Sequence, residues 1–206
     1  MKWVAGDLHL GYEWTEKQLA RISSFQSLIH PDDIVIYAGD IFEYAWHTRE
    51  EVASSLAFET FMNGLEGRCH FLSGNHDYSP TLPEYWHGDG ITVCHGHQFD
   101  LLADSAWKRW YYRLAPWFQE VWMNSPWEQK MQGNDQWQDH NAYVWGQAVK
   151  YLESINSNTL IMCHTHDSVD IYRPESEKTL IGLGSLPEDG AYALVDGEDI
   201  QIQFLN

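Results

Sequence analysis

The sequence predicts an α/β fold built from parallel strands that are joined by helices. Short apolar runs of strand length alternate along the chain with longer segments in which apolar residues recur at helical spacing. This repeated order of strand, helix and strand is typical of parallel pairing through crossover helices. Five of the apolar runs are closely followed by Asp, Asn or His. Because functional groups of such sheets gather beyond the carboxyl ends of the strands, these polar residues indicate one shared site.

The first half of the chain is predicted to contain three strands and two helices. The strands are expected at residues 3–6, 33–38 and 70–73, and the helices at residues 15–28 and 48–63. Thr48 has the residue type of a helix N-cap, so it is expected to begin the second helix. Gly74 follows the third strand, where a glycine lets the backbone turn sharply.

The second half contains two further buried runs and then a series of short alternating ones. The buried strands are expected at residues 91–94 and 159–162, and the shorter runs lie at residues 170–173, 178–183, 192–195 and 200–204. Glycines separate the shorter runs, which predicts an antiparallel end to the fold.

The stretch from Phe99 to about residue 153 interrupts this alternation. It has a helical pattern and holds seven of the eleven tryptophans. We therefore expect a helical insertion at about residues 99–153, within one domain that spans residues 1–206. Three basic residues in the insertion are candidates for binding the phosphate of a substrate. They are Lys108, Arg109 and Arg113.

The chain is strongly acidic, with 12 Lys and Arg residues against 30 Asp and Glu residues and a formal net charge of −18. Such a field repels long polyanions, which argues against long nucleic acid as a partner. The three cysteines form no Cys-x-x-Cys pair, and no apolar stretch is long enough to span a bilayer. The N-terminal residues have no signal-peptide pattern, so a cytoplasmic location is expected.

Seven oxygen and nitrogen donors stand at the ends of predicted strands. They are Asp7, His9, Asp40, Asn75, His95, His164 and His166. Seven donors exceed what one metal ion with an open position normally takes, so they predict two divalent ions. A carboxylate has two oxygens, which makes Asp40 the natural bridge between them. Mixed oxygen and nitrogen donors suit borderline metals such as manganese, iron or zinc better than magnesium or calcium. Manganese is the first choice, with iron, zinc or nickel as alternatives.

In these motifs the sequence resembles the calcineurin-like metallophosphoesterase superfamily. The matching motifs are Asp7-Leu8-His9, Gly39-Asp40, Gly74-Asn75-His76-Asp77, His95 and His164-Thr165-His166. The resemblance implies a four-layer αββα sandwich of two sheets flanked by helices. It also implies one ion held by Asp7, His9, Asp40 and His166, and a second held by Asp40, Asn75, His95 and His164.

The resemblance further implies a phosphoesterase. Its substrate would be a small phosphomonoester or phosphodiester, attacked by a hydroxide that bridges two ions about 3.5–4 Å apart. His76 takes the role of general acid for the leaving group. Glu43, three residues after Asp40, is expected to contact and orient His76, while Asp77 is expected to tie the loop.

The remaining histidines have no partner at motif spacing and are expected to be packing or surface residues. They are His30, His47, His70, His87 and His140, whereas His97 is intermediate because it could contact a ligand.

Three alternatives stay open at this point. Residues 39–46 and the helical insertion are similar to the UDP-2,3-diacylglucosamine pyrophosphohydrolases, which hold acyl chains in such an insertion. That group usually has Arg at the position of His76, so a lipid-linked pyrophosphate is the alternative substrate. A nuclease and a non-catalytic scaffold of the same fold are the other two. The acidic charge counts against the nuclease, and the complete ligand set counts against the scaffold.

Overall fold

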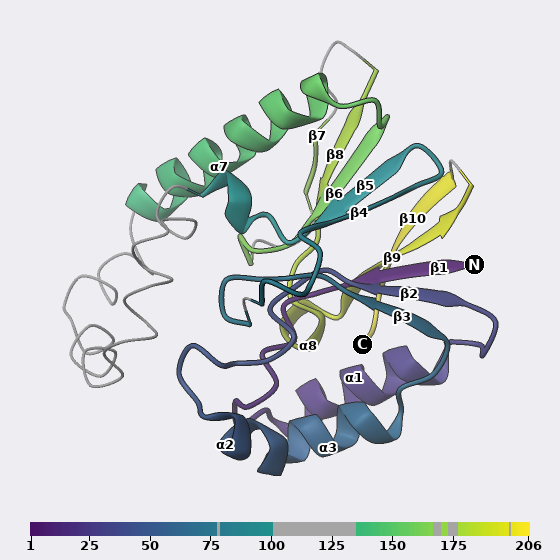
Figure 1. The fold of residues 1–206 in the computed structure, drawn as a ribbon, viewed down its shortest axis with the longest axis vertical. Coiled ribbons are helices and arrows are strands. Elements are labelled where there is room, and N and C mark those ends of the chain that lie inside the picture. Colours follow the sequence, from purple (N-terminus) through teal and green to yellow (C-terminus); the bar gives the residue numbers. More distant parts are fainter. Residues whose placement is uncertain (78, 101–134, 167–169, 173–176, 198) are drawn as a thin grey trace.

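The computed structural model describes residues 1–206 except 78, 101–134, 167–169, 173–176 and 198. It contains two five-stranded mixed sheets that lie between helices (Figure 1). The predicted α/β class and the four-layer order of helix, sheet, sheet and helix are confirmed.

The first sheet has the strand order β10-β9-β1-β2-β3. Its strands are β1 (Lys2–Ala5), β2 (Ile34–Tyr37), β3 (Arg68–Phe71), β9 (Ala191–Asp196) and β10 (Asp199–Phe204). β1, β2 and β3 are parallel, whereas β9 runs antiparallel to β1 and β10 antiparallel to β9. The carboxyl ends of the three parallel strands therefore point to the same edge of this sheet.

The second sheet has the strand order β4-β5-β6-β8-β7. Its strands are β4 (Tyr85–Gly88), β5 (Ile91–Cys94), β6 (Thr159–Met162), β7 (Asp170–Tyr172) and β8 (Thr179–Gly182). β5, β6 and β8 are parallel, with β4 and β7 antiparallel at the two edges. The carboxyl ends of β5, β6 and β8 therefore point to the same edge of this sheet.

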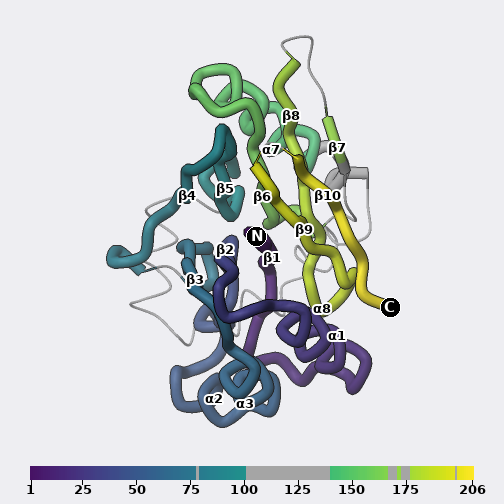
Figure 2. The backbone as a smooth tube through the Cα atoms, turned by 90° about the vertical axis from the view of Figure 1, so that its right-hand side faces the viewer, coloured from purple at the N-terminus to yellow at the C-terminus, as the bar shows by residue number. Residues whose placement is uncertain are grey.

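Helices cover the outer faces of both sheets. They are α1 (Glu16–Ser27), α2 (Arg49–Ser54), α3 (Leu56–Asn63), α7 (Asp135–Ser154) and α8 (Leu186–Asp189), with a 3-10 turn η1 (His97–Phe99). In the side view α1, α2 and α3 gather at one end of the molecule and α7 lies toward the other (Figure 2). Among the described residues, no helix is both long and apolar enough to cross a membrane.

In the part of the chain that the structure describes, three hydrophobic cores fill the spaces between the four layers. Alternate residues of a strand point to opposite faces of its sheet, so each central strand contributes to two cores. Ile161 of β6 packs in the core between the sheets, whereas its neighbours Leu160 and Met162 pack under α7. In the first sheet, Val4 faces the other sheet and Ala5 faces the helices. This alternation fixes the register of the strands and hence the height at which each strand ends.

The predicted helix over residues 48–63 is in fact two helices. Thr48 caps α2 through a capping box with Glu51, which confirms its predicted role. The chain then leaves the helical conformation at Ser55, which has a φ of −75° and a ψ of 145°. The Ser55 side chain accepts a hydrogen bond from the backbone N–H of Phe58 and begins α3. A serine that caps a second helix thus explains the break.

The strands differ from the prediction in two respects. β4 was not expected, because its sequence Tyr-Trp-His-Gly has no apolar run and its place depends on pairing with β5. β8 lies parallel to β6, so the last part of the chain is not wholly antiparallel.

The predicted insertion has two parts. Residues 101–134, including Lys108, Arg109 and Arg113, lie outside the described residues. Residues 135–154 form α7, whose Val144, Ala148 and Leu152 pack on the second sheet. α7 therefore belongs to the helical layer that covers the second sheet. The assignment of the whole chain to one domain stays a prediction.

The core between the sheets yields a test of stability. Ile161 is fully buried, whereas Ile171 on the edge strand β7 is 46% exposed. We expect Ile161→Ala to lower the free energy of unfolding by about 2–5 kcal/mol, because it removes buried methyl groups and leaves a cavity. Ile171→Ala, the matched control, should cost about 1 kcal/mol or less. Urea unfolding of both variants measures the difference, and equal losses would contradict this account of the core.

Candidate metal centre

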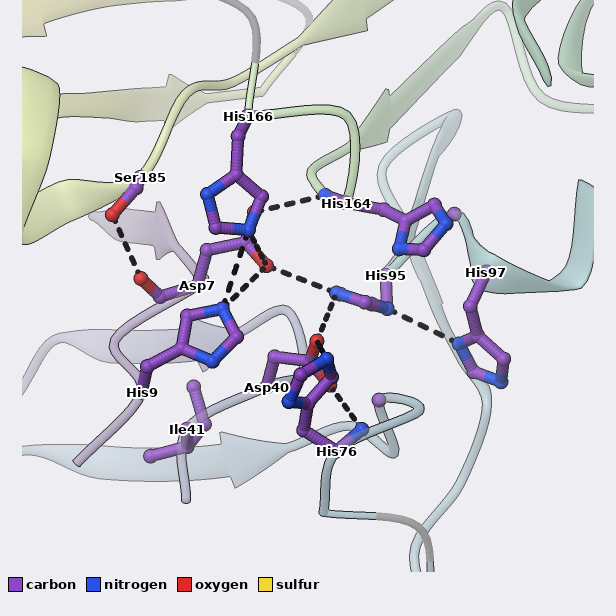
Figure 3. A network of polar contacts seen from close by, with 12 residues as sticks. Asp7, His9, Asp40, Ile41, His76, His95, His97, His164, His166 and Ser185 are labelled. Carbon is purple, nitrogen blue, oxygen red and sulfur yellow. Dashed lines mark hydrogen bonds and ion pairs between the residues drawn. The ribbon is translucent and has the colours of Figure 1, made fainter. Parts of the chain in front are cut away.

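The predicted site residues lie where the parallel strands of both sheets end. Asp7 and His9 follow β1, and Asp40 follows β2. His95 follows β5, while His164 and His166 follow β6 (Figure 3). The Nε2 atom of His95 lies 3.0 Å from Oδ1 of Asp7 and 3.3 Å from Oδ2 of Asp40. Residues from the two sheets therefore meet in one buried cluster.

The backbone at this site is unusual. Positive φ angles are rare for residues other than glycine. Five of the seven predicted ligands nevertheless have φ between 44° and 74°, namely Asp7, His9, Asp40, His164 and His166. Such conformations cost about 1–3 kcal/mol each and persist where the surroundings hold them. One such support is Ser185, whose hydroxyl donates to the backbone carbonyl of Asp7 at 2.9 Å.

Gly74 is needed for space. Its φ is not among the positive values found in the described residues. A Cβ atom at Gly74 would lie 1.9 Å from Oδ1 of Asp40. The glycine therefore lets the loop after β3 pass against the Asp40 carboxylate, which differs from the sharp turn expected from the sequence.

Among the described residues, three groups of side chains bring their donor atoms within 4.8 Å of one another. The groups are Asp7, His9 and His166; Asp40, His95 and His164; and His9, Glu43 and His76. The first two are subsets of the two predicted ligand sets. The Oδ1 atom of Asn75 is buried and has no hydrogen-bond partner in the described structure. A buried oxygen of this kind normally requires a partner, and a cation is one.

Charge in the cluster also fits cations. Burial alone would raise the pKa of Asp7 and Asp40, but nearby imidazoles outweigh it and lower both values. Burial would likewise lower the pKa of His95, yet Asp40 and Asp7 raise it to about 10. The buried carboxylates thus draw positive charge to this place. Divalent cations with carboxylate and imidazole ligands supply the same charge, so the donor set suits them.

In each predicted histidine ligand, one ring nitrogen contacts a further side chain. Metal-bound histidines usually have such a partner, which fixes the ring. The pairs are His9 Nδ1 with Glu43 at 2.5 Å, His95 Nδ1 with His97 at 3.2 Å, His164 Nε2 with Asp100 at 3.0 Å, and His166 Nδ1 with Glu188 at 3.3 Å.

Sequence reasoning missed two of these partners. Asp100 and Glu188 are two among thirty acidic residues, and no motif spacing singles them out. His140, which is expected to be a packing or surface residue, is half-buried, and its Nε2 atom lies 3.1 Å from Oδ2 of Asp100. His97 contacts His95, as considered from the sequence.

Glu43 joins His76 to the cluster. Its Oε1 atom lies 2.6 Å from Nδ1 of His76, and its Oε2 atom lies 2.5 Å from Nδ1 of His9. The predicted contact between Glu43 and His76 is therefore present. Burial would lower the pKa of His76, but the charge of Asp40 and the hydrogen bond with Glu43 raise it to about 9. The His76 side chain is 22% exposed, so it borders the cluster and solvent.

Asp77 ties two loops together. Its Oδ1 atom accepts the backbone N–H of Gly74 at 2.8 Å, and its Oδ2 atom accepts that of Ile41 at 2.7 Å. Burial and the charge of Asp40 raise the pKa of Asp77 to about 6. These contacts confirm the role in the loop that was expected for it.

A family model of the calcineurin-like phosphoesterases matches residues 3–180. The chain therefore belongs to the calcineurin-like phosphoesterase family. No curated protein sequence matches the chain.

Several solved structures are similar in fold. Wild-type Vps29 of Entamoeba histolytica, complexed with Zn²⁺, is 16% identical, with 98% of this chain and 89% of that chain covered and a TM-score of 0.51. A cold-active protein tyrosine phosphatase is 14% identical over 98% of this chain and 75% of that chain, with a TM-score of 0.50. The cold-active protein-tyrosine phosphatase of a psychrophilic Shewanella species is 14% identical over 98% of this chain and 77% of that chain, with a TM-score of 0.49. At these identities the likeness concerns the fold alone.

Replacing Asp77 tests its role in the loops. We expect Asp77→Asn to lower the free energy of unfolding by about 1–3 kcal/mol, because one acceptor becomes a donor that faces a buried N–H. Asp32→Asn is the control, since the Asp32 side chain is 96% exposed. Denaturant unfolding of the metal-free proteins gives both values. Wild-type stability in Asp77→Asn would show that the hydrogen bonds to Gly74 and Ile41 contribute nothing.

Proposed function

We propose that the protein is a metal-dependent phosphoesterase that uses two divalent cations. The observation that carries this proposal is the meeting of two three-donor groups around His95, which contacts carboxylates from both. Asp7, His9, Asp40 and His166 would hold one cation. Asp40, Asn75, His95 and His164 would hold the other, with manganese as the first choice. When bound, such cations polarise the phosphoryl group and activate a water.

His76 is the candidate general acid. It is not needed as a ligand, and its Nε2 atom lies 4.0 Å from Oδ2 of Asp40, next to both donor groups. Its backbone N–H donates to Oδ1 of Asp40 at 2.9 Å, which holds the residue beside the cluster. A protonated imidazole here can transfer its proton to the oxygen of a departing alcohol.

Glu43 is the candidate positioning residue for His76. The Glu43 side chain is fully buried, so its two oxygens are fixed by the imidazoles that they contact. The contact with Nδ1 of His76 leaves Nε2 as the nitrogen that can reach a leaving group. A carboxylate in this place also favours the charged form of the ring.

The proposed substrate is a small phosphomonoester or phosphodiester. The net charge of −18 disfavours long polyanions, and family membership supports a phosphorylated substrate. A panel of phosphomonoesters, phosphodiesters and pyrophosphate esters, assayed with Mn²⁺, tests the class. UDP-2,3-diacylglucosamine belongs in the panel, because preferred cleavage of it would favour the lipid-linked alternative. Hydrolysis of none of these esters by metal-loaded protein would rule out the proposal.

Asp40→Asn tests the bridging role of Asp40. We expect turnover of an aryl phosphate ester to be abolished and the metal content per protein to fall, because both proposed ion sites lose a carboxylate. Turnover and elemental analysis of the same preparation measure the two effects. Asp32→Asn, on the surface, should keep wild-type values of both. Full activity in Asp40→Asn would refute the assignment of two ions to this site.

His76→Ala tests the acid role. General acid catalysis contributes about 10²–10⁴-fold, and most where the leaving group is a poor one. We therefore expect hydrolysis of alkyl phosphate esters to slow by about that factor, and hydrolysis of 4-nitrophenyl esters to slow much less. Metal content should stay at the wild-type level. His70→Ala, at an exposed position of β3, is the control, and an equal loss on both ester types would remove His76 from this role.

A further inference from the structure

Asp100 joins three separate segments beside the second donor group. It directly follows η1 and is 5% exposed. Its Oδ2 atom lies 3.0 Å from Nε2 of His164, in the loop after β6. The same oxygen lies 3.1 Å from Nε2 of His140, in α7. One buried carboxylate oxygen therefore contacts two imidazoles from different elements.

This contact determines which nitrogen of His164 can bind a cation. An ionised carboxylate only accepts hydrogen bonds, so Nε2 of His164 must carry the hydrogen. In a neutral imidazole the other nitrogen, Nδ1, then has a free lone pair. His164 belongs to the group with Asp40 and His95, and Figure 3 shows one of its ring nitrogens turned toward His95. Nδ1 is therefore the nitrogen of His164 that could bind a cation together with Asp40 and His95.

α7 also holds the loop that carries His164. The side-chain amide of Asn141, next to His140, donates to the backbone carbonyl of Thr165 at 3.5 Å. The backbone of His164 has a φ of 74°, a conformation that requires support from its surroundings. Two adjacent residues of α7 therefore reach this loop, one through Asp100 and one directly.

We infer that Asp100 and His140 are positioning residues for His164. Asp100 fixes the tautomer and the direction of the His164 ring, and His140 fixes Asp100 from α7. Together they set how tightly the group of Asp40, His95 and His164 holds a cation. The inference rests on the proposed function, because it takes His164 as a ligand.

The contact of Glu188 with His166 provides a matched comparison. It is also a carboxylate–imidazole pair on a proposed ligand, with 3.3 Å between Oε2 and Nδ1. The Glu188 side chain is 45% exposed, however, whereas that of Asp100 is 7% exposed. Solvent competes with the hydrogen bond between Glu188 and His166, and it is excluded from the one between Asp100 and His164. The effect of removing Asp100 should therefore be the larger one.

The first readout is the ring ¹⁵N spectrum of the metal-free protein at slightly alkaline pH. The signal of His164 is assigned from its loss in His164→Asn. We expect the Nε2–H tautomer in wild type and a shift toward the Nδ1–H tautomer in Asp100→Asn, where the amide N–H can face the ring. Glu188→Gln should move the signal of His166 and leave that of His164 in place. An unchanged His164 tautomer in Asp100→Asn overturns the inference.

The second readout is Mn²⁺ affinity by titration calorimetry. Loss of a residue that orients a ligand typically lowers metal affinity about 10–100-fold. We expect such a loss for the ion held by the group of Asp40, His95 and His164 in Asp100→Asn, and a smaller loss in His140→Ala. His140→Gln should restore much of it, since its amide can donate to Asp100. Wild-type affinity for both ions in Asp100→Asn also overturns the inference.

Failure of the proposed function has a different signature. Wild-type protein that binds two ions and hydrolyses none of the esters would refute the phosphoesterase, and the ¹⁵N and affinity results would still decide the role of Asp100. Circular dichroism of each variant confirms that it is folded. If Asp100→Asn does not fold, equal affinities in His140→Ala and wild type overturn the inference.

Discussion

The structure depends on two carboxylates, Asp7 and Asp40, that are buried at the ends of neighbouring parallel strands. Buried charges are costly unless partners of opposite charge surround them. Here His95 reaches from the second sheet to contact both, at 3.0 Å and 3.3 Å. At the edge where their parallel strands end, the two sheets therefore meet through charged side chains, while the core behind this edge is apolar. Packing of that core sets the height of the strand ends, and hence whether these groups can meet.

Glu43 extends the same network to the proposed acid. Its two oxygens contact His9, a proposed ligand, and His76, the proposed proton donor. Ion binding and proton transfer would then share one buried carboxylate. Such a shared role would account for a buried glutamate at a position where burial of a charge is costly.

The outer helices do more than cover the sheets. α7 packs on the second sheet through Val144, Ala148 and Leu152, and its first described side chains reach the loop of His164. A helix that buries an apolar face thereby also carries residues that contact the site. Membership of the calcineurin-like phosphoesterase family agrees with this architecture, and the phosphoesterase chemistry proposed for it uses the groups that the four layers bring together.

The sequence by itself determined the strand ends and the residue types placed there. Apolar runs located β5 and β6 to the residue, and the motifs named the donors that the structure brings together. Only the tertiary structure decided the partners of those donors. Asp100 and His164 are 64 positions apart, and Glu188 and His166 are 22 apart, so no local pattern links them. Periodicity and motif spacing report neighbours along the chain, whereas these contacts arise from the packing of layers.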